Sequence, residues 1–304
     1  STPIKSSAAS DVYKRQDEYS RLRPDSIRLI EPGKGYCGVD AYHLYDSGTI
    51  ELIDDADQQD LSDGVLADSL KNAIRHYIIA SAIMFKRGRK SSEMIIHSHR
   101  NVSDHSTIYR MVDVFIQSFK DQVEFKDTEG LEVTKSEYAL AYSVYFDKSI
   151  QQSYDFDSLW AIICSKIIRR VYLILKNSAG QVTQANENLR KYKVYIGGDL
   201  LQRGVTFPGL VTTYFSRWAK DSGNMDTNLQ RARWFGYREK WIDLCKIFTS
   251  ETIAREFTNL SEIETDLWEQ FYSIQSGEMQ IDEILIRADN TKQKPTRKNV
   301  ATYN

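Results

Sequence analysis

The chain has 304 residues, enough for one large domain or two modest ones at roughly 100–200 residues each. Forty basic against 42 acidic side chains give a net charge of -2, which excludes a global field that attracts nucleic acid and leaves such contacts to local basic patches. Cys37, Cys164 and Cys245 match neither a zinc spacing nor a disulfide framework, and no apolar run reaches the length of a membrane span, so we expect a cytoplasmic protein.

Residues 1–16 have no apolar periodicity, and residues 11–16 (DVYKRQ) resemble the translated end of a transposase adapter used in sequencing libraries. We therefore expect a scar outside the fold, with an ordinary disordered tail as the alternative. A scar implies a gene truncated on its 5′ side, whose product starts further upstream. Residues 17–64 are polar and broken by proline and glycine, and predict a linker with one or two short strands such as 49–53.

Apolar residues at helical spacing predict an amphipathic helix over residues 65–86, which Gly88 is placed to end. A basic run, residues 86–90, follows. Residues 121–153 are charged and tyrosine-rich without one clear period, and predict an insertion. Short apolar strands and further helices alternate along the rest of the chain, the strands at 94–99, 171–177, 192–197, 210–216 and 244–249 and the helices at 107–119, 159–170, 227–237 and 253–273. This alternation predicts an α/β fold with a parallel sheet covered by helices on both faces.

Polar residues follow three of the predicted strands, at 97–100, 198–204 and 216–217. The carboxyl ends of parallel strands meet at one edge of the sheet, where ligands bind. Gly198 lets backbone N–H groups approach a phosphate, Arg203 supplies a fork of donors, and Thr206 adds a hydroxyl. The alternative is a tight turn with a surface arginine, and spacing alone rates the two about even.

The predicted helix 227–237 carries a second group of polar residues. Gln230 and Arg233 are three apart and share a helical face, and Arg238 follows near the helix end, where it is placed to point across a cleft. An arginine that reaches a transferring phosphoryl group stabilises its developing charge. The alternative is a structural helix, whose aromatic residues pack in the core and whose arginines stack or pair on the surface.

These two segments together resemble known motor motifs. GGDLLQRG, at residues 197–204, resembles motif V of superfamily-2 helicases, and QRARWFGYR, at 230–238, resembles motif VI, the arginine-finger helix. MIIHSHRNVSDH, at 94–105, resembles the motif IV strand. RWFGYR followed by DLC, at 243–245, is similar to the Z1 domain, found in predicted endonucleases that carry a helicase-like motor. The resemblance covers roughly residues 36–260.

The resemblance implies a RecA-like helicase C-terminal lobe over residues 65–250, with the insertion 121–153, and a helical extension with a tail over 251–304. It places Gly198, Asp199, Arg203, Gly204 and Thr206 at the interface between ATP and the nucleic-acid backbone. Arg233 and Arg238 face the γ-phosphate with support from Gln230, and three residues touch the nucleic-acid backbone: His99, Arg100 and Arg217. The two arginines are five apart rather than the usual three, and Arg231-Ala232 replaces Met-Gly, so either one is a candidate for the finger; we favour Arg238.

The sequence contains no G-x-x-x-x-G-K-S/T phosphate loop. Residues 53–57 imitate a DExD motif, but without a phosphate loop upstream we interpret them as an acidic loop. An upstream RecA-like lobe is therefore expected to hold ATP and Mg²⁺, with no metal bound by this chain. Asp113, Glu124 and Lys126 imitate a metal-nuclease pattern that is weak in so charged a chain, and His97 with His99 has no third zinc ligand.

We predict the motor lobe of a nucleic-acid-dependent ATPase in a bacterial or phage defence system of the restriction type. DNA is the expected nucleic acid, with RNA as the alternative, and ATPase or nuclease subunits of the same system are further partners. A second hypothesis is a degenerate RecA-like module that binds nucleic acid through the basic run 86–90 without a motor. A third is a scaffold that docks a separate ATPase or nuclease through the insertion and the carboxy-terminal helix.

Overall fold

The computed structural model describes residues 13–15, 28–43, 48–97, 102–177, 180–181, 190–198, 206–216 and 229–287. A seven-stranded sheet with the order β3-β10-β8-β4-β7-β5-β6 lies at its centre. The first six strands in this order run parallel, and β6 is antiparallel to β5. The strands are β3 Ile50–Ile53, β4 Ser92–His97, β5 Val171–Asn177, β6 Gly180–Gln181, β7 Tyr192–Gly197, β8 Leu210–Phe215 and β10 Lys246–Ser250. This is the RecA-like α/β fold class that the sequence predicts.

The central strands are buried on both faces. Every residue of β4 and β8 is buried, which is why these segments read as continuous apolar runs rather than as alternating ones. The predicted strands are confirmed to within two residues at either end. The segment predicted as a linker, 17–64, contributes more than expected, because its strand β3 pairs in parallel with β10 and forms one edge of the main sheet.

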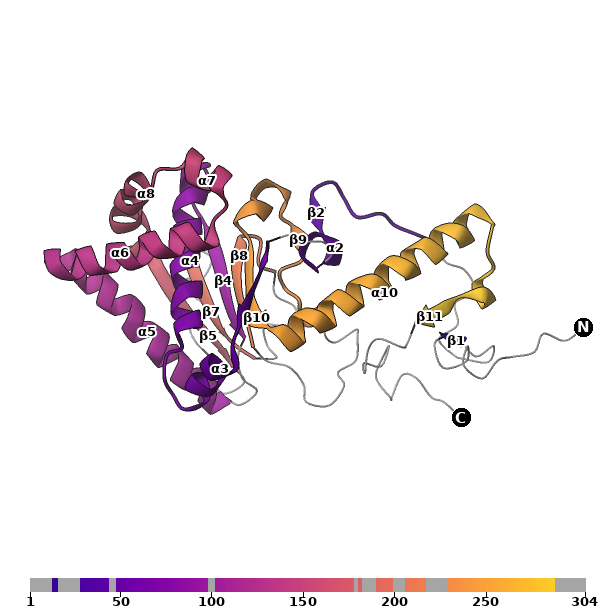
Figure 1. Cartoon of the computed structure of the whole chain (residues 1–304), viewed down its shortest axis with the longest axis horizontal. Coiled ribbons are helices and arrows are strands. Elements are labelled where there is room, and N and C mark those ends of the chain that lie inside the picture. The colour runs from indigo at the N-terminus through magenta and orange to yellow at the C-terminus, as the bar shows by residue number, and fades with distance from the viewer. Residues whose placement is uncertain are drawn as a thin grey trace, which may run out of the picture.

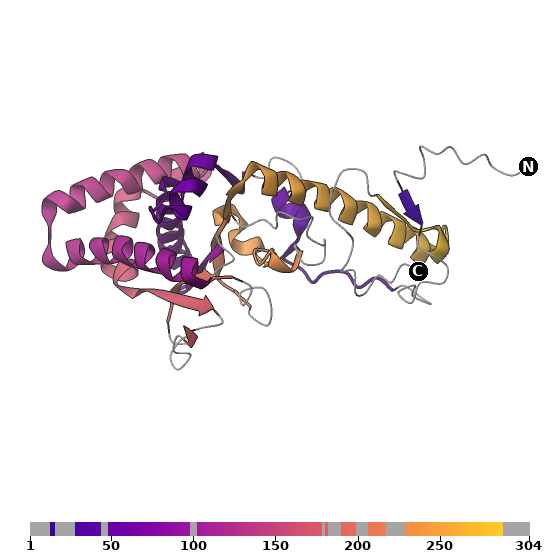
Figure 2. The same ribbon diagram turned by 90° about the horizontal axis from the view of Figure 1, so that it is seen from below.

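One face of the sheet is covered by the helices α4 Asp68–Lys86, α5 Val102–Phe125, α6 Thr128–Tyr145, α7 Lys148–Ser153 and α8 Phe156–Ile162. The helix α4 lies against β4 and β8, and α5 lies against β5 and β7. Figures 1 and 2 show α5 and α6 as an antiparallel hairpin that projects from the sheet. The segment 121–153 has no single period because it spans the end of α5, all of α6 and α7, each with its own buried face. Two further helical turns, η1 Ile163–Ile167 and η2 Ile168–Arg170, lead into β5.

The other face carries a second apolar cluster around α2 Val39–His43 and α10 Glu251–Ser276. Ser250 caps the start of α10 by accepting from the N–H of Ile253, and Gly277, at φ 84°, ends the helix. The helix extends well beyond the sheet (Figure 1). Near its far end β11 Leu285–Arg287 follows the turn η6 Ile281–Glu283 and pairs with β1 Tyr13–Arg15, which lies in the segment expected to be a scar. No helix of the described part of the chain is both long and apolar enough to cross a membrane.

The predicted helix 227–237 is wrong in its second half. Among the described residues only 229–231 are helical, and the chain then turns into β9 Gly236–Tyr237, which pairs with β2 Tyr36–Cys37. Gly236 has φ 147°, which side-chain-bearing residues rarely adopt. The segment continues through the 3-10 turns of η5 Glu239–Leu244 into β10.

Candidate functional site

The candidate site is built on residues 229–245, here called the arginine segment. It lies over the second face of the sheet and is anchored there by Trp234, which is buried against Phe215 and Phe257. The indole Nε1 donates to Nε2 of His43 at 3.2 Å. Burial lowers the pKa of His43 to about 3, so the imidazole is neutral and able to accept this bond.

Arg238 turns back onto its own segment. Its side chain is buried, with 4% of its surface exposed, and Nε donates to the carbonyl of Trp234 at 3.1 Å. Nη2 lies 3.5 Å from the carbonyl of Arg233. Among the ion pairs of the described residues, none includes Arg238. The guanidinium is therefore held by carbonyl oxygens. The sequence had suggested that it points across an open cleft, and in the structure it does not.

Arg233 lies beside Arg238 and is only half-buried. Its guanidinium lies 5.9 Å from the ring centroid of Phe207, whose ring packs edge-on against Tyr195 of β7. Burial lowers the pKa of Arg233, and the neighbouring charge of Arg238 lowers it further. The positive charges of Arg233 and Arg238 are thus held close together, because Arg238 donates hydrogen bonds to the backbone of this segment.

Arg89 is a third member of this group, and nothing in its sequence context singles it out. It lies between α4 and β4, stacks over the ring of Trp241 at 4.3 Å and donates to the carbonyl of Pro208 at 2.7 Å. The backbone N–H of Trp241 in turn donates to the carbonyl of Arg238 at 2.8 Å. Burial lowers the pKa of Arg89, Glu93 opposes the shift and Arg238 adds to it. The only signal in the sequence was membership of the basic run 86–90, which does not tell a stacked arginine from a solvated one.

Glu93, the acidic side chain whose charge acts on Arg89, is engaged elsewhere as well. It pairs with Lys193 at 2.8 Å and accepts from the backbone N–H of Gly209 at 3.0 Å. Arg89, Arg233 and Arg238 lie close enough for their charges to act on one another, and together they are called the arginine cluster. Arrangements of this kind bind phosphates and carboxylates, because a planar guanidinium matches their oxygen atoms.

The other predicted site residues are not all gathered here. Gly198 follows the carboxyl end of β7, whereas Thr206 is exposed and precedes the turn into the amino end of β8. Gln230 is exposed on the short helical turn that opens the arginine segment. The remaining predictions fall outside the described residues: Asp199, Arg203, Gly204, His99, Arg100 and Arg217.

Two weaker patterns have structural explanations. Asp54 caps the helix α3 Asp55–Ser62, and the carboxylate of Asp57 accepts from the N–H groups of Asp68 and Ser69 at the start of α4. The DExD-like stretch was predicted to be an acidic loop, but residues 55–62 form the helix α3, and Asp54 and Asp57 serve as caps for α3 and α4. Asp113 and Glu124 lie on α5, and the described residues contain no group of three or more side chains suited to a metal ion.

The fold and the arginine cluster define the class of the protein: a RecA-like α/β domain with a cationic segment over one face of its sheet. The family follows from comparison with known families. The family model for the Z1 domain matches residues 69–294, so the chain belongs to the Z1 domain family. This membership suggests a nuclease-like function. Neither the curated proteins nor the solved structures contain a match to the chain.

Proposed function

We propose that this chain is the carboxy-terminal motor lobe of a helicase-like, nucleic-acid-dependent ATPase, which works as a DNA endonuclease in a bacterial or phage defence system. In this proposal a preceding RecA-like lobe supplies the phosphate loop and the Mg²⁺ site, and the arginine cluster completes the ATP site. ATPase or nuclease subunits of the same cytoplasmic system are its partners. The observation that carries the proposal is the buried Arg238, which takes part in none of the described ion pairs, with Arg233 beside it.

A buried charge is costly unless a counter-charge or several hydrogen bonds compensate for it. A guanidinium has five N–H donors, and the described bonds of Arg238 use its Nε and Nη2 atoms. A phosphoryl group, with its spread negative charge, is suited to compensate the buried charge of Arg238. This requirement favours a phosphate ligand over a purely structural cluster.

The two finger candidates have different roles in this proposal. Arg238 bonds to the carbonyls of Arg233 and Trp234, so it fixes the backbone that carries Arg233. Arg233 is the less buried of the two and is placed to reach a ligand outside the domain. We therefore assign the phosphate contact to Arg233 and the positioning role to Arg238, the reverse of the preference from sequence.

A binding module without a motor has less support. That hypothesis relied on the basic run 86–90 as a free patch, but three of its cations are engaged within the molecule. Lys86 Nζ donates to Ser158 Oγ at 2.6 Å, Arg87 pairs with Asp243 at 2.6 Å and Arg89 stacks on Trp241. Phosphates of nucleic acid would have to compete with these contacts.

The proposal is tested by titrating the chain with inorganic pyrophosphate in a calorimeter. Arg233→Ala should weaken binding about tenfold or more, because a charge-assisted hydrogen bond contributes about 1.5–3 kcal/mol. Arg233→Lys should recover part of the loss, since it keeps the charge without the fork. The matched control is Arg255→Ala, an exposed arginine of α10 whose partner is Glu251. Equal affinity in the wild type and in Arg233→Ala would contradict the assignment.

A further inference from the structure

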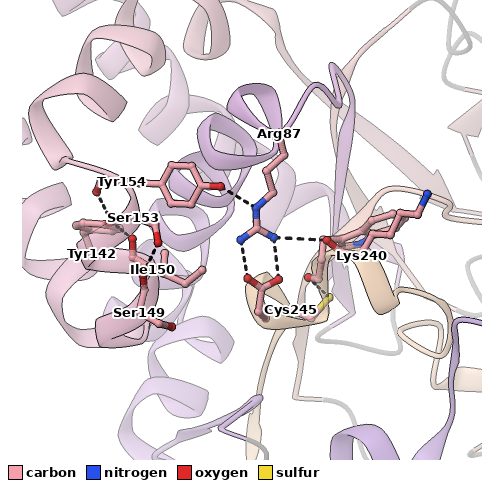
Figure 3. Close-up of polar contacts among 10 residues, drawn as sticks. Arg87, Tyr142, Ser149, Ile150, Ser153, Tyr154, Lys240 and Cys245 are labelled. Atoms are coloured by element: carbon pink, nitrogen blue, oxygen red, sulfur yellow. Dashed lines mark hydrogen bonds and ion pairs between the residues drawn. The ribbon is translucent and has the colours of Figure 1, made fainter.

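The end of α4 places one side chain between two parts of the molecule that are far apart in sequence. The Nη1 and Nη2 atoms of Arg87 donate to the two carboxylate oxygens of Asp243 at 2.8 and 2.6 Å. Its Nε atom donates to the hydroxyl of Tyr154 at 3.1 Å, and the guanidinium lies 5.6 Å from the centroid of that ring. Figure 3 shows Arg87 between Tyr154 on one side and the turn that carries Lys240 and Cys245 on the other.

Tyr154 is held firmly within the helical part, at the junction of α7 and α8. The hydroxyl of Tyr142, on α6, donates to the carbonyl of Tyr154 at 2.6 Å and to that of Ile150 at 3.2 Å. The N–H of Tyr154 donates to the carbonyl of Ile150 at 2.9 Å. A shift of α6 or α7 therefore moves Tyr154, and through it Arg87.

Asp243 belongs to a part of the arginine segment whose backbone is tied by its own hydrogen bonds. It lies in η5, where Trp241 N–H donates to the carbonyl of Arg238 at 2.8 Å and the thiol of Cys245 lies 3.5 Å from the carbonyl of Trp241. The hydrogen bonds that Arg87 donates to Asp243 are the main cause that raises the pKa of Arg87. Both side chains are partly exposed, at 26% and 38%, so the pair contributes defined geometry more than stability.

We propose that Arg87 is a positioning residue that couples the helical part α6–α8 to the arginine segment. When a bound partner or nucleic-acid strand shifts these helices, Tyr154 moves with them. Its contact with Arg87, and that of Arg87 with Asp243, then displace the backbone of Arg238. The consequence for phosphate binding rests on the proposed function; the mechanical coupling does not.

The coupling is tested by amide hydrogen exchange in a double-mutant cycle. Tyr142→Phe removes the hydrogen bond to the carbonyl of Tyr154, and should raise the exchange rate of residues 238–245 about three- to tenfold in the wild-type background, the range expected for coupled neighbours. In an Arg87→Lys background the same change should add nothing, because the link is already broken. Equal effects in both backgrounds, or none in either, would overturn the proposal.

A matched control comes from the same helix. Arg75 of α4 pairs with Glu137 of α6 at 2.6 Å, and its guanidinium lies 5.6 Å from the ring centroid of Phe115. Glu137→Gln removes this pair but leaves the hydrogen bonds of Tyr142, Tyr154 and Arg87 in place. It should change exchange at residues 238–245 by less than Tyr142→Phe does, whereas a general loosening of the fold would make the two effects equal.

A second arm separates this proposal from the proposed function. Asp243→Asn should weaken pyrophosphate binding by about threefold or more, and Asp243→Glu, which keeps the carboxylate, should restore much of it. If the chain binds no pyrophosphate while exchange coupling is present, the phosphate site is wrong and the coupling stands. If the chain binds pyrophosphate and Asp243→Asn binds as tightly as the wild type, Arg87 does not position the arginines.

Discussion

At the scale of single residues, the arginine segment depends on one buried histidine. His43 accepts from the indole of Trp234 and stacks on Phe257 with ring centroids 5.0 Å apart. Only the neutral imidazole can accept this bond while it remains buried. The protonation state of His43 therefore helps to decide whether the anchor of the segment is intact.

Acid should weaken the fold through His43. Its pKa is about 3 in the folded protein against an ordinary value of 6.5, so its stabilising contribution is complete above pH 6.5 and is lost as the pH falls from 6.5 toward 3. The loss approaches about 1.4 kcal/mol per pH unit. We expect urea unfolding at pH 7, 6 and 5 to show a steeper decline in the wild type than in His43→Gln, which keeps an acceptor but does not titrate.

A second buried histidine, His76, also adds to the loss of stability in acid, but its contribution cancels when the two proteins are compared. Burial lowers its pKa well below the ordinary value, and it contributes a similar slope in both proteins. The difference in slope between the wild type and His43→Gln therefore reports the uptake of about one proton, at His43. Parallel declines of the unfolding free energy in the wild type and in His43→Gln would show that His43 is charged in the folded state.

At the scale of elements, the acidic stretch after β3 joins two helices. The two carboxylate oxygens of Asp57 each accept from one N–H group at the start of α4, at 3.2 Å. The first N–H groups of a helix have no partners inside it, so a carboxylate at this position satisfies donors and interacts favourably with the helix dipole.

Removing this cap should cost stability and leave ligand binding unchanged. Asp57→Ala is expected to lower the free energy of unfolding by about 1 kcal/mol, the usual cost of a lost cap. Asp60→Ala, an exposed acidic residue of the same helix α3, controls for the loss of charge. Calorimetric titration of both variants with Mg²⁺ should match the wild type; a loss of Mg²⁺ binding only in Asp57→Ala would revive the DExD interpretation.

At the scale of the whole molecule, the proposal makes the chain half of an ATP site. The sequence contains arginines suited to a phosphate but no phosphate loop to hold one. We expect the isolated chain to show no ATP turnover above buffer, with or without DNA. Robust turnover by the chain alone would end the two-lobe proposal.

The two-lobe proposal also predicts an active assembly. Joined to a lobe that carries the phosphate loop, the chain should support DNA-stimulated turnover. Arg233→Ala should abolish that turnover while nucleotide binding stays largely intact, because a finger acts mainly on the transition state. A turnover rate equal to that of the wild type would remove Arg233 from the catalytic step.

The sequence by itself determined the layers of this fold. Apolar runs such as 192–197 and 210–215 are buried strands because both of their faces meet helices or packed segments, and most of the predicted helix 65–86 is the helix α4, which packs on the sheet. These patterns are local: a period of two, an unbroken apolar run or a period of 3.6 is written within ten to twenty residues. The family resemblance followed from equally local motifs.

Only the tertiary structure decided the shape of the candidate site. Residues 232–237 leave the helix because β2 pairs with Gly236 and because Trp234 finds His43, 191 positions away in the chain. Arg89 and Arg87 have the same local context in one basic run, yet one stacks beside Arg238 and the other binds Asp243 and Tyr154. Local sequence records which side chains are polar, whereas the partner that fixes each of them is supplied by a distant segment that only folding brings near.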